Sequence, residues 1–325
     1  MSIALFDEIR IYYGSDKLTT IFRDLVDNNV EEALKSLNQK NLQFPSFFVL
    51  HNEINNSGLD ERLSTRNKFA LNLINQVLSD EELDSERLQS GNTQENLAYV
   101  RWILESGCSE DGLSDQFDQV LDTSAIILSK LYNDRSCLST IENLIFDRYR
   151  KGSYIYDLTW VFFETLNPQN LNTLANRLRS ANPKDVELAH KFLNFIPGID
   201  SRNDDSRKQY QAALKWINRN QNFLYFTGAT NQQTTEPLRY MVSLQAKYLQ
   251  KPAYSIMTEQ SRALRKEEVT YLENFNNLDE DIKLLLSNCS DFLCRSDRNK
   301  WGKWLHSPIE KQIEIAERMV GNHND

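Results

Sequence analysis

The sequence predicts an all-α protein in which antiparallel helix pairs stack as an irregular α-solenoid. Three segments with a continuous apolar face, over residues 121–134, 154–168 and 185–197, recur at a spacing of roughly thirty residues, which is typical of stacked helical repeats. Each is followed by a turn and a more polar helical segment, and short turns make neighbouring helices run antiparallel. Glycine and proline are scarce, at 10 and 7 residues, and most prolines lie at expected helix boundaries, where they do least damage.

Helical spacing of apolar residues also describes the first part of the chain. It predicts two short helices within residues 17–40, broken at residues 27–29, and a longer helix over 59–80. The apolar segment 41–54 is compatible with a buried helix or a short strand, and we favour a helix because no partner strand follows. The acidic, polar stretch 80–96 predicts a linker.

Two regions follow from this pattern. We expect an acidic helical N-terminal region over residues 1–90 and a helical-repeat region over residues 91–325, with a more basic part at 227–325. The second region should begin with a helix at 95–106 and include a long helix over 207–226, followed by a polar loop at 227–237. Four more helices are predicted over 238–250, 258–275, 278–294 and 307–321.

The helix pairs over about residues 115–226 resemble those of HEAT and armadillo-type repeat proteins. The clearest unit is residues 182–200, which has Pro183 near its start and apolar residues at helical spacing after it. This resemblance implies a scaffold or adaptor with an extended binding surface. The units nearer the C-terminus depart from the pattern because they lack a constant repeat length.

Composition and charge narrow the classes of protein that fit. Hydrophobic residues make up 40% of the chain, and the mean hydropathy is −0.57, which predicts a folded protein without a membrane segment. With no signal-peptide pattern at residues 1–17 and only four cysteines, we expect a cytoplasmic protein with reduced thiols. Residues 1–150 hold 14 Lys and Arg against 25 Asp and Glu, a net charge of −11, and residues 151–325 hold 23 against 21, a net charge of +2. Any contact with a polyanion should therefore lie beyond residue 200.

Motifs for catalysis or cofactor binding are not found, and we expect no cofactor and no metal. Cys289 and Cys294 are spaced Cys-x4-Cys on an expected helix near His306, without the second pair that a zinc site needs. The acidic runs at 80–84 and 200–205 lack a DDxxD arrangement and are expected to be solvated. No nucleophile elbow, P-loop or dinucleotide-binding motif occurs, and His190 has no partner at readable spacing.

Basic and aromatic residues mix in two segments, 215–226 and 294–304. Three interpretations fit them: nucleic-acid binding through residues 207–304, protein recognition, or aromatic core anchors surrounded by solvated cations. We favour a non-catalytic scaffold or adaptor that binds a protein, with a HEAT-like nucleic-acid-binding protein or base-acting enzyme as the alternative. The oligomeric state is left open. The predicted binding residues are Trp216, Arg219, Tyr225, Arg298, Trp301 and Trp304.

Overall fold

The computed structural model describes residues 4–79, 88, 93–168, 171–199, 205–230, 233–234, 237–257 and 264–321. Over these residues the protein is all-α apart from one short two-stranded sheet. Contacts divide the chain into two compact units, Met1–Thr165 and Leu166–Asp325. The predicted boundary between residues 90 and 91 lies outside the described residues. The first unit has a net charge of −12, from 15 Lys and Arg against 27 Asp and Glu, and the second a net charge of +3, from 22 against 19.

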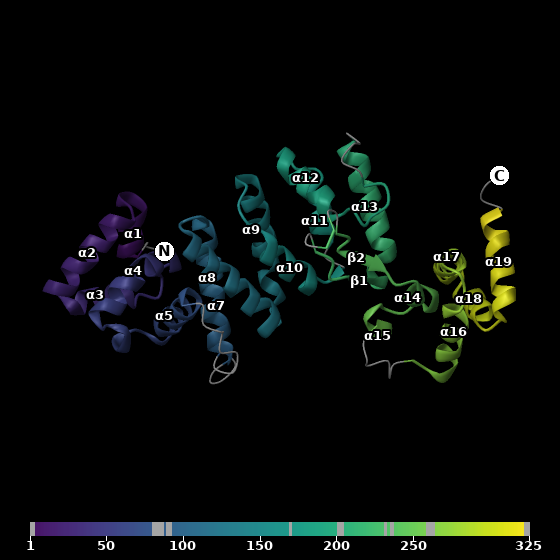
Figure 1. Ribbon diagram of the computed structural model, residues 1–325, viewed down its shortest axis with the longest axis horizontal. Helices are drawn as coiled ribbons and strands as arrows, with labels where there is room; N and C mark the ends of the chain where they lie inside the picture. The colour runs from purple at the N-terminus through teal and green to yellow at the C-terminus, as the bar shows by residue number, and fades with distance from the viewer. Residues whose placement is uncertain are drawn as a thin grey trace. The chain divides into compact units, whose positions relative to one another are not determined.

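The first unit begins with helices that pack against their neighbours in sequence (Figure 1). They are α1 (Leu5–Tyr13), α2 (Ser15–Asn28), α3 (Val30–Leu37), α4 (Phe44–Ser57) and α5 (Thr65–Leu78). The predicted break between two short helices, at residues 27–29, lies between α2 and α3 at Asn29, whose side chain accepts a hydrogen bond from the backbone N–H of Glu32 and so caps α3. The ambiguous apolar segment forms a helix, as predicted, with Pro45 in the first turn of α4.

Four more helices complete the description of this unit: α7 (Thr93–Gly107), α8 (Asp115–Ile126), α9 (Leu138–Lys151) and α10 (Tyr156–Thr165). Helix α8 continues into a five-residue π-helix, Ile127–Leu131. Helix α7 packs on α4, α5 and α8, and α10 packs on α8 and α9. Most of the predicted linker, residues 80–87 and 89–92, lies outside the described residues.

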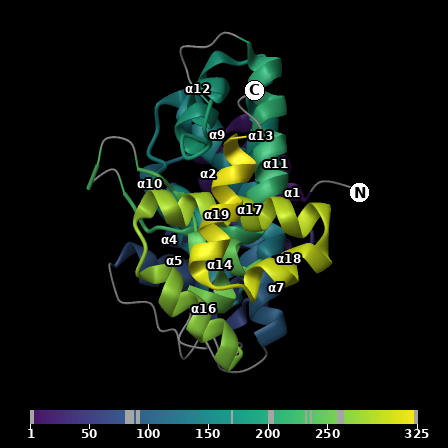
Figure 2. The ribbon, with the colours of Figure 1, turned by 90° about the vertical axis from the view of Figure 1, so that its right-hand side faces the viewer.

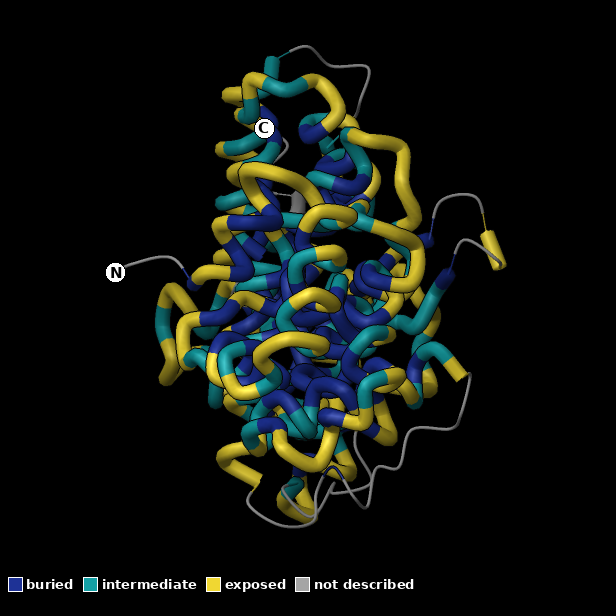
Figure 3. Tube along the Cα trace, turned by 90° about the vertical axis from the view of Figure 1, so that its left-hand side faces the viewer, coloured by how far each residue is buried: buried dark blue, intermediate teal, exposed yellow. Residues whose placement is uncertain are grey.

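Aromatic rings and one glycine set how closely these helices approach. Phe44 of α4 stacks on Phe117 of α8, with ring centroids 5.6 Å apart. A Cβ atom added to Gly107 would lie 2.5 Å from Cδ2 of Leu121, so the end of α7 can lie this close to α8 only because residue 107 has no side chain. Buried positions alternate with exposed ones along the helices, as amphipathic sequences require (Figure 3).

A buried ion cluster ties α9 to α8. The Arg148 guanidinium lies 2.8 Å from a carboxylate oxygen of Asp111 and 2.8 Å from one of Asp122. The side chains of Arg148 and Asp111 are 2% and 4% exposed. Arg148 is the close cation of both acids, and Asp111 has a longer ion pair with Lys151 at 3.8 Å, so loss of the arginine should destabilise the first unit.

The second unit begins with α11 (Asn172–Arg177), α12 (Pro183–Phe192) and α13 (Ser206–Asn220). Strands β1 (Leu224–Phe226) and β2 (Tyr240–Val242) then pair antiparallel, with Tyr225 opposite Met241. The predicted helices over 207–226 and 238–250 are therefore too long. Each contains a three-residue run with aromatic residues, Leu-Tyr-Phe in β1 and Tyr-Met-Val in β2, and the backbone groups of each run are satisfied by pairing with the other run.

Six helices follow: α14 (Leu244–Leu249), α15 (Tyr254–Met257), α16 (Lys266–Asn276), α17 (Glu280–Ser296), α18 (Arg298–Leu305) and α19 (Ile309–Gly321). Helix α17 contacts α14, α18 and α19, and Figure 2 shows α19 crossing it. Helix α18 was not among the predicted helices. It begins after Asp297, whose carboxylate accepts hydrogen bonds from the backbone N–H groups of Asn299 and Lys300. No helix in the part of the chain that the structure describes is both long and apolar enough to span a membrane.

Candidate functional site

The two predicted tryptophans of α18 face the core of the second unit. Trp304 is 3% exposed, and its Nε1–H donates a 3.2 Å hydrogen bond to the backbone oxygen of Gln312. Trp301 is half-buried against the same core, and its Nε1–H donates to Oγ of Ser290 at 2.8 Å. Trp304, named above as a candidate binding residue, is therefore a core residue, because α18 turns its apolar side inward and its cations outward.

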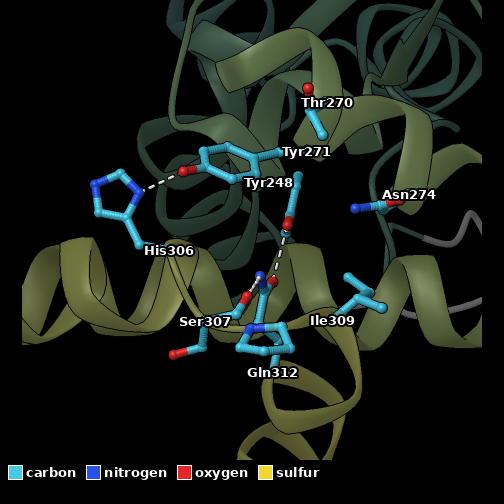
Figure 4. A pocket seen from close by; sticks show the side chains of 9 residues that line it. Tyr248, Thr270, Tyr271, Asn274, His306, Ser307, Ile309 and Gln312 are labelled. Carbon is cyan, nitrogen blue, oxygen red and sulfur yellow. Dashed lines mark hydrogen bonds between the residues drawn. The ribbon is translucent and has the colours of Figure 1, made fainter. Parts of the chain in front are cut away.

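Trp304 packs behind two residues, Tyr248 and Gln312, that line a half-open cavity of about 260 Å³, drawn in Figure 4. Its lining comes from α14, α16, the turn between α18 and α19, and the start of α19. The lining residues are Tyr248, Thr270, Tyr271, Asn274, His306, Ser307, Pro308, Ile309 and Gln312.

The floor of the cavity is a rigid hydrogen-bonded pair. The Tyr248 hydroxyl donates to Oε1 of Gln312 at 2.8 Å, and the Gln312 amide nitrogen donates to the backbone oxygens of Leu305 at 3.1 Å and Ser307 at 2.8 Å. The Tyr248 ring stacks on Phe275, with centroids 4.4 Å apart. Burial raises the pKa of Tyr248 to about 12, so its hydroxyl stays protonated.

The rim of the cavity carries a tyrosine–histidine pair. The hydroxyl of Tyr271 and Nδ1 of His306 are 2.5 Å apart. Burial, followed by the charge of Glu267, raises the pKa of Tyr271, which favours the neutral phenol as the donor. Among the described residues Nε2 of His306 makes no hydrogen bond, and it is the nitrogen left to meet a ligand.

The cavity combines apolar surface with neutral polar groups. Its described lining contains aromatic rings, hydroxyls, amides and one imidazole, but no Asp, Glu or Cys. The lining therefore suits an apolar group with a polar end, held by His306 or Asn274.

Arg219 belongs to a second polar feature, on α13, α14 and α17. The carboxylate of Asp291, 0% exposed, accepts from Nε of Arg219 at 2.6 Å and from Nε of Arg295 at 2.7 Å. Beside it, Nζ of the buried Lys247 donates to Oδ1 of Asn220 at 3.1 Å and Oδ1 of Asn288 at 2.8 Å. Burial lowers the pKa of Lys247 to about 8; the two arginines act in the same direction and Asp291 opposes them.

The other predicted binding residues lie apart from the cavity. Trp216 is half-buried on α13, edge-on to Phe195 with centroids 5.8 Å apart. Tyr225 is half-buried on β1, with its hydroxyl 3.8 Å from Sδ of Met241. Arg298 is exposed at the start of α18. None of these three lines the cavity.

No group of three His, Cys, Asp or Glu side chains arranged to hold a metal ion occurs in the described ranges of the chain. Cys289 is buried beside Sδ of Met319, at 3.6 Å, and burial raises the pKa of its thiol to about 11. This thiol therefore stays protonated and packs as an apolar group.

Sequence reasoning missed the residues that form the cavity and the arginine pair: Tyr248, Tyr271, Gln312, Lys247 and Asp291. A local signal existed only for Asp291 and Arg295, which are four residues apart on one helix. Comparisons of the chain with protein-family models, with curated proteins and with solved structures gave no match.

Proposed function

We propose that this chain is a non-catalytic helical scaffold or adaptor that binds a protein partner in the cytoplasm. In this proposal its helix pairs stack as an irregular α-solenoid of the HEAT or armadillo kind. The packing of helices on their neighbours in sequence supports such stacking in each unit: α1 packs on α2, α7 on α8, and α11 on α12. Stacked helices form firm frames whose surfaces hold binding residues in fixed positions.

The observation that carries the proposal is the cavity lined by α14, α16, the α18–α19 turn and the start of α19. At about 260 Å³ it is smaller than the range of roughly 300–1,000 Å³ that is usual for small-molecule sites. An aromatic floor with a polar rim matches the pockets in which one anchor side chain of a partner protein is buried. The floor is pre-formed, because Tyr248 and Gln312 hold each other in place.

The test is a selection of peptides from a displayed random library on the folded protein, followed by measured affinities for variants of the cavity. We expect the selected peptides to share one anchor side chain and to lose affinity at least about tenfold, or about 1.4 kcal/mol, with His306→Ala and with Asn274→Trp, which fills the rim. Lys208→Ala is the matched control, because this side chain is 82% exposed on α13 and does not line the cavity. Equal affinities for the wild type and both cavity variants would contradict the proposal.

The alternative is nucleic-acid binding, or action on a base, through residues 207–304. The exposed cations of α18, Arg298, Lys300 and Lys303, favour it. The packing of Trp301 and Trp304 against the core argues against nucleic-acid binding, because rings that stack on bases must be accessible at the surface. Binding of a single-stranded oligonucleotide that weakens steeply with salt and is unchanged by His306→Ala would favour this alternative.

A further inference from the structure

The guanidinium groups of Arg219 and Arg295 come from helices far apart in sequence and meet at one carboxylate. Asp291 binds Arg219 through one oxygen and Arg295 through the other, at 2.6 and 2.7 Å. Nη2 of Arg295 also donates to the backbone oxygen of Arg219 at 2.8 Å. Because Asp291 is fully buried and lies on the rigid helix α17, it holds both guanidiniums in one orientation.

Most of the donors on these two arginines are left for a ligand. Each guanidinium uses its Nε–H on Asp291, and the side chains of Arg219 and Arg295 remain 46% and 51% exposed. Within the part of the chain that the structure describes, both terminal nitrogens of Arg219 and Nη1 of Arg295 make no hydrogen bond. Two forks of N–H donors therefore face solvent from a fixed base.

Cations outnumber anions around Asp291. Arg219, Arg295 and Lys247 surround Asp291, which is the one acid among the described residues within ion-pair distance of any of the three cations. Three cations and one anion leave two positive charges uncompensated. Lys247 is buried and satisfied by two asparagine side chains, so the ligand would meet the two arginines while the lysine adds to the local positive potential.

We propose that Arg219 and Arg295 form a binding site for a phosphate monoester dianion, with Asp291 as the residue that positions both guanidiniums. The forked donors of arginine match the spacing of oxygens on a phosphate group. The two charges of a monoester balance the excess at the site, whereas a phosphodiester carries one. This inference is independent of the cavity at His306, since it concerns different side chains.

The experiment measures binding of inorganic phosphate, O-phosphoserine and a phosphoserine peptide to the full chain by calorimetry, at constant ionic strength set with chloride. We expect saturable binding of all three, with the tightest for the peptide if the group is carried by a protein and equal affinities if free phosphate is the ligand. Arg219→Lys and Arg295→Lys, which keep the charge and lose the fork, should each weaken binding at least fivefold. Lys303→Gln, an exposed cation of α18, is the control and should change affinity less than twofold.

Asp291→Asn separates positioning from simple charge attraction. It raises the net positive charge of the cluster by one, so an unstructured basic surface would bind phosphate more tightly. The proposed site should bind phosphate at least fivefold more weakly, because the guanidiniums lose their common base. Tighter binding by Asp291→Asn, unchanged affinity of both Arg→Lys variants, absence of saturable phosphate binding, or preference for a single-stranded oligonucleotide over the monoesters would each overturn the proposal.

Discussion

Trp304→Ala is the substitution that most directly tests the assignment of this tryptophan to the core. The side chain is 3% exposed, lies edge-on to Tyr248 with centroids 5.9 Å apart, and donates a hydrogen bond to Gln312. Truncating a buried tryptophan to alanine costs about 3–5 kcal/mol, which includes the transfer of the ring and the cavity left behind. A tryptophan at the surface would cost less than about 0.5 kcal/mol.

The assay is thermal and urea unfolding followed by circular dichroism, with hydrogen exchange to assign the effect to the second unit. For a unit of about 150 residues, each kcal/mol lowers Tm by about 2–4 °C, so the expected loss is about 6–20 °C. Amides of α14, α17 and α19 should lose protection together because these helices share the core around Trp304.

Tyr254→Ala provides the control, because this aromatic side chain of the same unit is 73% exposed. Its unfolding free energy should stay within about 0.5 kcal/mol of the wild type. The reasoning is refuted if Trp304→Ala is as stable as Tyr254→Ala, since the ring would then be at the surface in solution.

Three further predictions concern packing, buried charge and pH. Gly107→Ala should destabilise the first unit by about 1–3 kcal/mol, because the added methyl group overpacks against α8. Gly302→Ala, with no atom within 4 Å of the added Cβ, should instead stabilise α18 by about 0.5–1 kcal/mol. Thermal unfolding of the two variants compares these effects. Arg148→Met should cost about 3–5 kcal/mol because it leaves Asp122 without a cation and Asp111 with only the longer ion pair to Lys151. Arg23→Ala, which removes a side chain that is 61% exposed, should cost less than about 1 kcal/mol. Urea unfolding checks both, and equal losses would contradict the prediction. Since the pKa of Lys247 falls from 10.5 unfolded to about 8 folded, the folded state binds fewer protons between these values, and this lysine should make the second unit more stable as pH rises from about 8 to about 10.5. A side-chain NMR titration of Lys247 with a midpoint near 10.5 would contradict this.

The sequence predicted helix positions correctly where the signal lies within a few neighbouring residues. The predicted break at residues 27–29 lies between α2 and α3, and the helix favoured over 41–54 is found as α4, Phe44–Ser57. The predictions were wrong at 221–226 and 238–243, where helix periodicity was extended over segments that pair as strands. Strand pairing depends on a partner fourteen or more residues away, and the helical spacing of apolar residues gives no information about such a partner.

The candidate site was less accessible to sequence reasoning. Arg219 was selected for its residue type, but its partner Asp291 is 72 residues away. The cavity combines Tyr248 and Gln312, which are 64 residues apart. Such pairings are set by the crossing of helices, and no local spacing encodes them.

The sequence by itself determined the all-α class, most of the helices and the contrast between an acidic first part and a more basic second part, because periodicity, caps and charge act over a few residues or simply add up. Only the tertiary structure decided that Trp304 is a core residue, that Asp291 holds two arginines, and that Tyr271 and His306 meet at the rim of a cavity. The physical reason is that burial and long-range pairing depend on which helix faces come together, and an amphipathic helix can present the same tryptophan to a core or to a partner.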